Sequence, residues 1–106
     1  MALSVNINPI ALDELSQVVS YLHEHASART AERFVDIVRK SLIDLAKMPD
    51  LGAEVSFRRS ALSGIRCWPL KKPFKKYLIY YRVDGRKLDI IHVLHGSRDT
   101  ESILTG

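Results

Sequence analysis

The sequence contains a single cysteine, Cys67, among its 106 residues. One cysteine excludes a disulfide within the chain and suits a reducing compartment. The first ten residues lack both the basic start and the long apolar run of a secretion signal. No apolar run approaches the ~20 residues that a membrane-spanning helix needs. We therefore expect a soluble, cytoplasmic protein that has no membrane partner.

Motifs for a metal ion or a nucleotide phosphate are also missing from the sequence. The cysteine and the four histidines do not have the spacing of a zinc site, and no glycine-rich phosphate loop is present. We expect a protein without a metal or other cofactor. Cys67 is expected to be a small buried apolar residue rather than a nucleophile.

The length of the chain is that of one ordinary domain. A chain of this size buries roughly two-thirds of its unfolded surface, which is enough for a core without disulfides or metal ions. No internal repeat, low-complexity stretch or linker divides the sequence. A single domain over residues 1–106 is therefore expected.

Acidic residues are nearly absent from one segment of the chain. Residues 58–87 hold ten Lys or Arg and one Asp, whereas residues 1–57 hold five basic and eight acidic ones. The formal net charge of +4 therefore originates in this segment. Such a concentration of one sign suggests a polyanionic partner, either nucleic acid or an acidic protein segment. The alternative is a solvated sheet edge that lysine protects from pairing.

The most strongly patterned part of the chain predicts a β-hairpin. Residues 77–83 are aromatic and β-branched, and residues 88–95 consist mainly of Ile, Leu and Val. Asp84-Gly85 between them is a strong turn signal, because glycine tolerates a positive φ. Both faces of the second strand carry apolar residues, so we expect it near the middle of a sheet. Strict alternation puts Leu88, Ile90, His92 and Leu94 on one face, and Asp89, Ile91, Val93 and His95 on the other.

Two amphipathic helices are predicted before this hairpin. Apolar residues at helical spacing favour one helix over residues 9–26 and a second over residues 29–48. Asn8 suits the N-cap of the first helix, and Pro49 helps to end the second. The short connection between them implies an antiparallel helical hairpin.

The remaining segments complete an α+β fold. Alternating apolar residues predict a half-buried strand over residues 3–7, and residues 65–70 predict a short strand that Pro69 places at an edge or beside a bulge. Residues 49–63 read as a loop, and Asp99 could cap a last helical turn. The expected fold is an N-terminal strand and an antiparallel helical hairpin packed on a small twisted, mainly antiparallel β-sheet. The opposite face of the sheet would be open to a partner.

Several short motifs follow one another along nearly the whole chain. They are Ala11, Asp13 and Leu15 with Tyr21-Leu22; Ala31, Phe34 and Leu45 with Pro49 and Gly52; Gly64-Ile65-Arg66; the strand Tyr77-Leu78-Ile79-Tyr80-Tyr81-Arg82; and the ending Val93-Leu94-His95-Gly96-Ser97-Arg98-Asp99. In this order and spacing they resemble the RelE/ParE superfamily of toxins from type II toxin–antitoxin pairs. The ending and the strand are more similar to the ParE-like branch.

The resemblance implies a microbial toxin that is held inactive by an antitoxin encoded beside it. The superfamily has two activities. ParE-like members act on DNA gyrase and have no recognised nuclease site, whereas RelE-like members cleave messenger RNA in the ribosome. We expect a ParE-like toxin that inhibits gyrase by binding; the alternatives are a RelE-like ribonuclease and a basic adaptor that has lost toxicity.

Cleavage of RNA through its 2′-hydroxyl needs a base, an acid and a cation. Arg66 matches an arginine that contacts the scissile phosphate in RelE-like nucleases, and His95 could fill the position of their C-terminal His or Tyr. If the chain is a nuclease, the resemblance thus implies Arg66, His95 and Arg98 as catalytic residues. No tyrosine follows Tyr81, which departs from members that use a C-terminal Tyr.

Binding to a partner is the other role for the basic side chains. The carboxylates of an antitoxin would meet the basic segment, either at a sheet edge or in a groove beside the helical hairpin. The partner-binding candidates are Arg58, Arg59, Arg66, Lys71, Lys72, Lys75, Lys76 and Arg82.

Each candidate also has a purely structural interpretation. Arg66 and Arg82 could pair with acidic residues across the sheet, and Arg98 could tie the tail to the body of the domain. His92 is expected to be a hydrogen-bonded residue of the core. For His95, at the end of a strand, a structural and a functional role both stay open.

Overall fold

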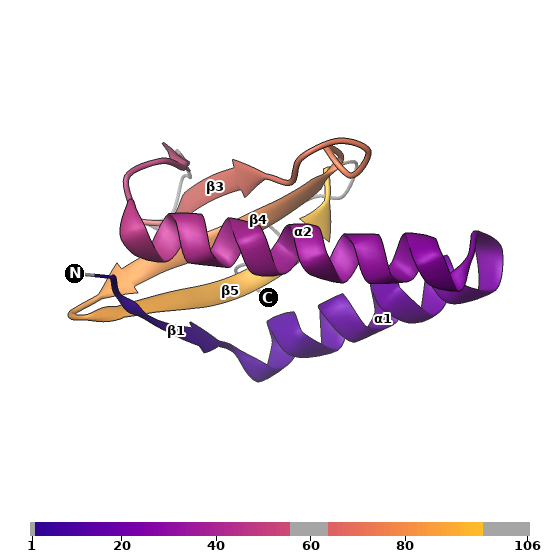
Figure 1. The fold of residues 1–106 in the computed structure, drawn as a ribbon. Coiled ribbons are helices and arrows are strands. Elements are labelled where there is room, and N and C mark those ends of the chain that lie inside the picture. The colour runs from indigo at the N-terminus through magenta and orange to yellow at the C-terminus, as the bar shows by residue number, and fades with distance from the viewer. Residues whose placement is uncertain (1, 56–63, 97–106) are drawn as a thin grey trace.

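The structure is a computed structural model that describes residues 2–55 and 64–96. The chain forms β1 (Ser4–Ile7), α1 (Pro9–His25), α2 (Ala28–Lys47), β2 (Ala53–Glu54), β3 (Arg66–Pro69), β4 (Tyr77–Asp84) and β5 (Lys87–His95) (Figure 1). The five strands make one sheet in the order β1-β5-β4-β3-β2. Strand β1 runs parallel to β5, and the other neighbours are antiparallel. The predicted α+β fold is confirmed.

A side chain caps the start of each helix: Asn8, as expected from the sequence, and Ser27, which was expected in the connection. The Asn8 side chain accepts a hydrogen bond from the backbone N–H of Ile10 at 2.9 Å, and Pro9 occupies the first turn of α1. The Ser27 side chain caps α2 by accepting from the N–H of Thr30 at 3.0 Å. Only Ala26 and Ser27 separate the helices, so they fold back into the predicted hairpin. No described helix is long and apolar enough to cross a membrane.

Both helices cover the same face of the sheet (Figure 1). Phe34 of α2 is fully buried there, and its ring meets the ring of Phe74 edge-on, with the centroids 5.2 Å apart. The main core joins the helices to the central strands; its largest fully buried side chains include Phe34, Leu45, Ile79, Tyr81, Leu88 and Ile90. A second, smaller cluster contains Ile65, Tyr80 and Leu94.

Strand β5 lies inside the sheet, as predicted. The strict alternation of its side chains between the two faces of the sheet is wrong. Leu88, Ile90 and Val93 belong to the helix-side core, whereas Leu94 belongs to the second cluster. The reason is an irregularity in the pairing with β4, where the register shifts between Tyr80 and Tyr81. One extra residue in β5 reverses the direction of every side chain that follows.

Two further details of the sheet differ from or extend the sequence interpretation. Residues 53–54, expected in a loop, pair with β3 as the short strand β2. Because β2 reaches only Arg66 and Cys67, no described strand pairs with Pro69 on that side, which suits a residue without an N–H. The turn between β4 and β5 contains Gly85 at a φ of +60°, as Asp84-Gly85 predicts. The expected helical turn at Asp99 lies outside the described residues.

Replacing Phe34 with Ala should test the helix-side core. Because the ring is fully buried, Phe34→Ala should lower the free energy of unfolding by about 3–5 kcal/mol. Ile43→Ala on the exposed side of the same helix is the matched control and should change it by about 0.5 kcal/mol or less. Urea denaturation followed by circular dichroism measures both. Equal losses for the two variants would contradict the packing described.

Candidate functional site

Six basic side chains of residues 58–87 form two groups at opposite ends of β4. Lys71, Lys72, Lys75 and Lys76 are exposed in the connection between β3 and β4, which we call the lysine loop (residues 71–76). Arg86 and Lys87 are exposed at the β4–β5 turn. An eight-residue strand separates the two groups, which is about 24 Å. The basic residues of this segment are therefore not all gathered in one place, and Arg58 and Arg59 lie outside the described part of the chain.

Arg82 is exposed on β4, three residues before Gly85. In the sheet register it lies opposite Asp89 of β5. Asp89 also accepts a hydrogen bond from the side chain of Asn6 at 3.0 Å. Asp89 is therefore the acidic cross-strand neighbour of Arg82 in the register.

Arg66 is held by the segment that follows α2. Its Nη1 donates to the carbonyl of Gly52 at 2.6 Å and more weakly to that of Asp50 at 3.4 Å. Its Nη2 lies 3.6 Å from Asp50 Oδ1 and 3.5 Å from Glu54 Oε1. The Arg66 side chain is 25% exposed, whereas those of Asp50 and Glu54 are 93% and 79% exposed. Backbone bonds therefore orient the guanidinium, and two largely solvated carboxylates reduce its positive field.

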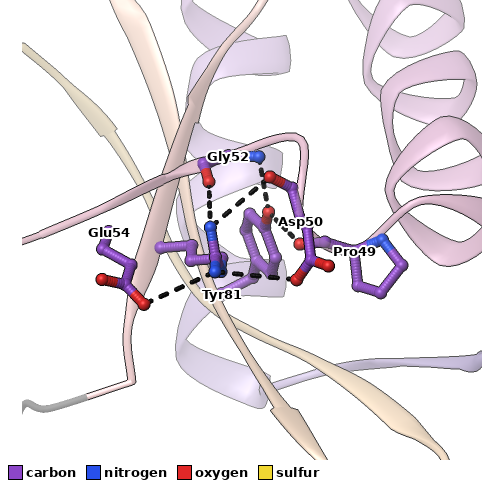
Figure 2. A network of polar contacts seen from close by, with 6 residues as sticks. Pro49, Asp50, Gly52, Glu54 and Tyr81 are labelled. Carbon is purple, nitrogen blue, oxygen red and sulfur yellow. Dashed lines mark hydrogen bonds and ion pairs between the residues drawn. The ribbon is translucent and has the colours of Figure 1, made fainter.

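Tyr81 fixes the same segment from beneath (Figure 2). Its hydroxyl donates to the carbonyl of Pro49 at 2.6 Å and accepts from the N–H of Gly52 at 2.8 Å. A Cβ at position 52 would overlap the Tyr81 hydroxyl, so only glycine allows this approach. Burial raises the pKa of Tyr81, although the bond from Gly52 and the charge of Arg66 partly oppose the shift. Tyr81 and Arg66 thus set the path of the chain into β2.

The structure keeps the nuclease candidates apart. Arg66 is paired with Tyr81, and His95 with Tyr77, so the two are four residues apart along β4, or about 13 Å. The ring of His95 packs edge-on against that of Tyr77, with centroids 5.3 Å apart. Arg98, the third candidate, lies outside the described residues. Arg66 and His95 therefore do not form a joint site in this conformation.

His92 is a hydrogen-bonded core residue, as predicted. Its Nδ1 lies 2.8 Å and 3.1 Å from the two carboxylate oxygens of Glu14 on α1. Glu14 Oε1 also accepts from the backbone N–H of Val93 at 3.0 Å. Strand β1 pairs with β5 only as far as Ile90, so Glu14 satisfies the strand edge where β1 has ended. Sequence reasoning missed this role, because the 78 positions between Glu14 and His92 leave no local signal.

Cys67 is only partly buried, on β3. Burial raises the pKa of its thiol, and a hydrogen bond with Tyr80 opposes part of the shift. A raised thiol pKa disfavours the nucleophilic thiolate. Among the described residues, no group of three or more His, Cys, Asp or Glu side chains could hold a metal ion.

Comparison with known proteins decides the family. The model of the ParE toxin of the type II toxin–antitoxin system parDE matches residues 5–100. The chain belongs to the ParE toxin family. It is thus a toxin of the ParE/RelE superfamily of type II toxin–antitoxin systems. No curated protein matches its sequence.

Solved structures of two toxin–antitoxin systems contain the same fold. A chain of the chromosomal ParDE system from P. aeruginosa has a TM-score of 0.71 and 16% identity, over 89% of this chain and 96% of that one. A chain of the RelBE2 toxin–antitoxin complex from Mycobacterium tuberculosis has a TM-score of 0.60 and 18% identity, over 90% of this chain and 99% of that one. At these identities the likeness concerns the fold.

Removing the Tyr81 hydroxyl should loosen the segment before β2. Tyr81→Phe leaves the buried N–H of Gly52 without its acceptor, so the free energy of unfolding should fall by about 1–3 kcal/mol. The variant should also change the pH dependence. The folded pKa of Tyr81 is raised, so the wild type retains this stabilisation below pH ~10 and loses it as the pH rises further.

Urea denaturation between pH 9 and 11.5 measures both effects. Tyr81→Phe should show a shallower loss of stability above pH 10 than the wild type, because the unfolded tyrosine no longer releases a proton. Tyr21→Phe, at an exposed tyrosine, is the control; it should stay closer to the wild type and lose only the contribution that Tyr21 makes to the raised pKa of Tyr77. Parallel curves for Tyr81→Phe and the wild type would refute this account.

Proposed function

We propose that the chain is a ParE-like toxin that inhibits DNA gyrase by binding it and blocking it on DNA. Family membership supports the toxin assignment. The separation of Arg66 from His95 supports binding rather than RNA cleavage, because an acid, a base and a cation must meet at one phosphate. The carboxylates of Asp50 and Glu54 beside Arg66 add to this argument, since they reduce the positive field that a phosphate would meet. The site of action would be the cytoplasm.

A cognate antitoxin encoded by a neighbouring gene is the proposed physiological partner. The exposed lysine loop would receive acidic side chains of the antitoxin, because four cations of one sign attract a polyanionic segment. Such charges act mainly on the association rate and on specificity. The second basic group, Arg86 and Lys87, lies at the other end of β4 and provides the comparison for the test below.

Expression of the lone chain tests the gyrase proposal. DNA synthesis should stop first while protein synthesis continues, and purified gyrase with supercoiled plasmid should accumulate cleaved DNA when the chain is added. His95→Asn should retain this activity, because the proposal assigns no chemistry to His95. Rapid arrest of translation with cut messages, abolished by His95→Asn, would instead support the RelE-like ribonuclease. Harmless expression would favour an adaptor.

Charge reversal tests the antitoxin contact. Lys71→Glu/Lys72→Glu should slow association with the antitoxin at low salt by about tenfold, as measured by surface plasmon resonance. Arg86→Glu/Lys87→Glu changes the net charge equally at the far end of β4 and should have a much smaller effect. Arg58→Glu/Arg59→Glu would extend the test to the partner-binding candidates outside the described residues. Equal association rates for the two described pairs would refute a contact at the lysine loop.

A further inference from the structure

The outer edge of β1 is unpaired in the described part of the chain. Strand β1 ends the sheet, and β5 is its neighbour on the inner side (Figure 1). The N–H groups of Ser4 and Asn8 each donate to a carbonyl on the β5 side at 3.0 Å. The alternate residues Val5 and Ile7 therefore point their backbone groups away from β5. Among the described residues, none hydrogen-bonds to the N–H or C=O groups of Val5 and Ile7.

This edge also lacks the features that usually prevent pairing with another strand. Edge strands are commonly protected by charged side chains, a proline or a bulge. Strand β1 is short, but it has the sequence Ser-Val-Asn-Ile without any of these features, and Val5 is 41% exposed. At the opposite edge, β2 has only two residues, and one of them is the charged Glu54. Strand β1 thus offers the better template for an added strand.

A second copy of β1 fits this edge in one register. Each copy has two free N–H and two free C=O groups on the outer side. If two copies run antiparallel with Asn6 opposite Asn6, Val5 of each faces Ile7 of the other, and these groups form four hydrogen bonds with none left over. A two-fold axis at Val5 would instead place Ile7 opposite Leu3, whose N–H is already bonded to the Ala46 carbonyl.

The side chains of β1 are complementary to themselves in the same register. The Asn6 side chain gives one N–H to Asp89 at 3.0 Å, and its amide has a second N–H and a carbonyl oxygen. Opposite residues at a non-hydrogen-bonded position lie close together, so the two Asn6 amides can exchange hydrogen bonds across the axis. On the other face, Val5 and Ile7 form apolar cross-strand pairs.

The charges at the two ends of β1 favour a second copy over an acidic segment. The N–H of Leu3 donates to the Ala46 carbonyl at 2.9 Å, so the exposed Lys47 lies near the start of β1. The exposed Asp13 lies in the first turns of α1, shortly after the end of β1. An antiparallel pair brings the start of one strand to the end of the other. Opposite charges of the two copies then approach each other.

We propose that β1 pairs with β1 of a second copy of this chain, so that two sheets join across a two-fold axis at Asn6. The interface is isologous, as in most dimers of identical chains. The dimer is weak, because two four-residue strands bury little surface. This self-association is separate from the gyrase proposal and does not use the lysine loop.

Disulfide cross-linking of the purified full chain tests the register. In a Cys67→Ser background, Asn6→Cys places two thiols opposite each other at a separation that a disulfide can span. Oxidation should therefore convert Asn6→Cys to a covalent dimer at least about tenfold faster than Ser4→Cys, whose thiols would lie about 13 Å apart. Equal rates for these two edge positions would overturn the proposed register.

Sedimentation equilibrium tests the dimer itself. The wild type should pass from monomer to dimer between micromolar and millimolar concentration. Val5→Pro removes one outward N–H and no bond to β5, so it should raise the dissociation constant about tenfold or more. Val5→Ala keeps this N–H and should have a smaller effect, and circular dichroism checks that both variants are folded.

Three results would overturn the second-copy proposal. The first is a wild type that stays monomeric at millimolar concentration. The second is a dimer of equal strength in Val5→Pro. The third is a monomeric wild type whose antitoxin binding is lost in Val5→Pro, which would assign the edge to an antitoxin strand. None of these results bears on gyrase inhibition.

Discussion

The fold depends on the burial of one face of the β4–β5 hairpin beneath α1 and α2. Ile79, Tyr81, Leu88 and Ile90 are fully buried there, and Phe34 of α2 packs into the same core. The hairpin cannot bury this face by itself, and neither can two amphipathic helices, so each layer requires the other. Burial of this apolar surface is the main stabilising contribution and fixes where the helices lie.

Polar contacts then complete the margins of this packed layer. At one margin the Tyr81 hydroxyl and Arg66 hold residues 49–54, so the chain leaves α2 in a defined path and pairs as β2. At the other margin, where β1 has ended, Glu14 accepts a hydrogen bond from the backbone N–H of Val93 at the edge of β5. Each contact satisfies a buried or half-buried polar group that would otherwise cost free energy.

Much of the fold could be predicted from the sequence, because its signals are local. Helical spacing, the cap at Asn8 and the Asp84-Gly85 turn each act within a few residues. The contacts that arise between distant residues could not be read in this way. Glu14 contacts His92 only when the helical hairpin packs on the sheet. The register shift between Tyr80 and Tyr81 depends on how β4 and β5 pack against the core. The segregation of charge was visible in the sequence, but its division between two ends of β4 depends on the strand bounds.

Arg66 illustrates why a residue that matches a family motif need not have the role that the motif implies. The bond from its Nη1 to the Gly52 carbonyl is short and part-buried, so the guanidinium plane is oriented whether or not a ligand is present. Its Nη2 faces two carboxylates that are largely in water, and exposed ion pairs of this kind contribute only about 0–1 kcal/mol each. An approaching anion therefore has to replace Asp50 and Glu54, at low cost, but meets a cation whose field they have already reduced. The behaviour of Arg66 toward any anion is thus set as much by these two neighbours as by the arginine itself.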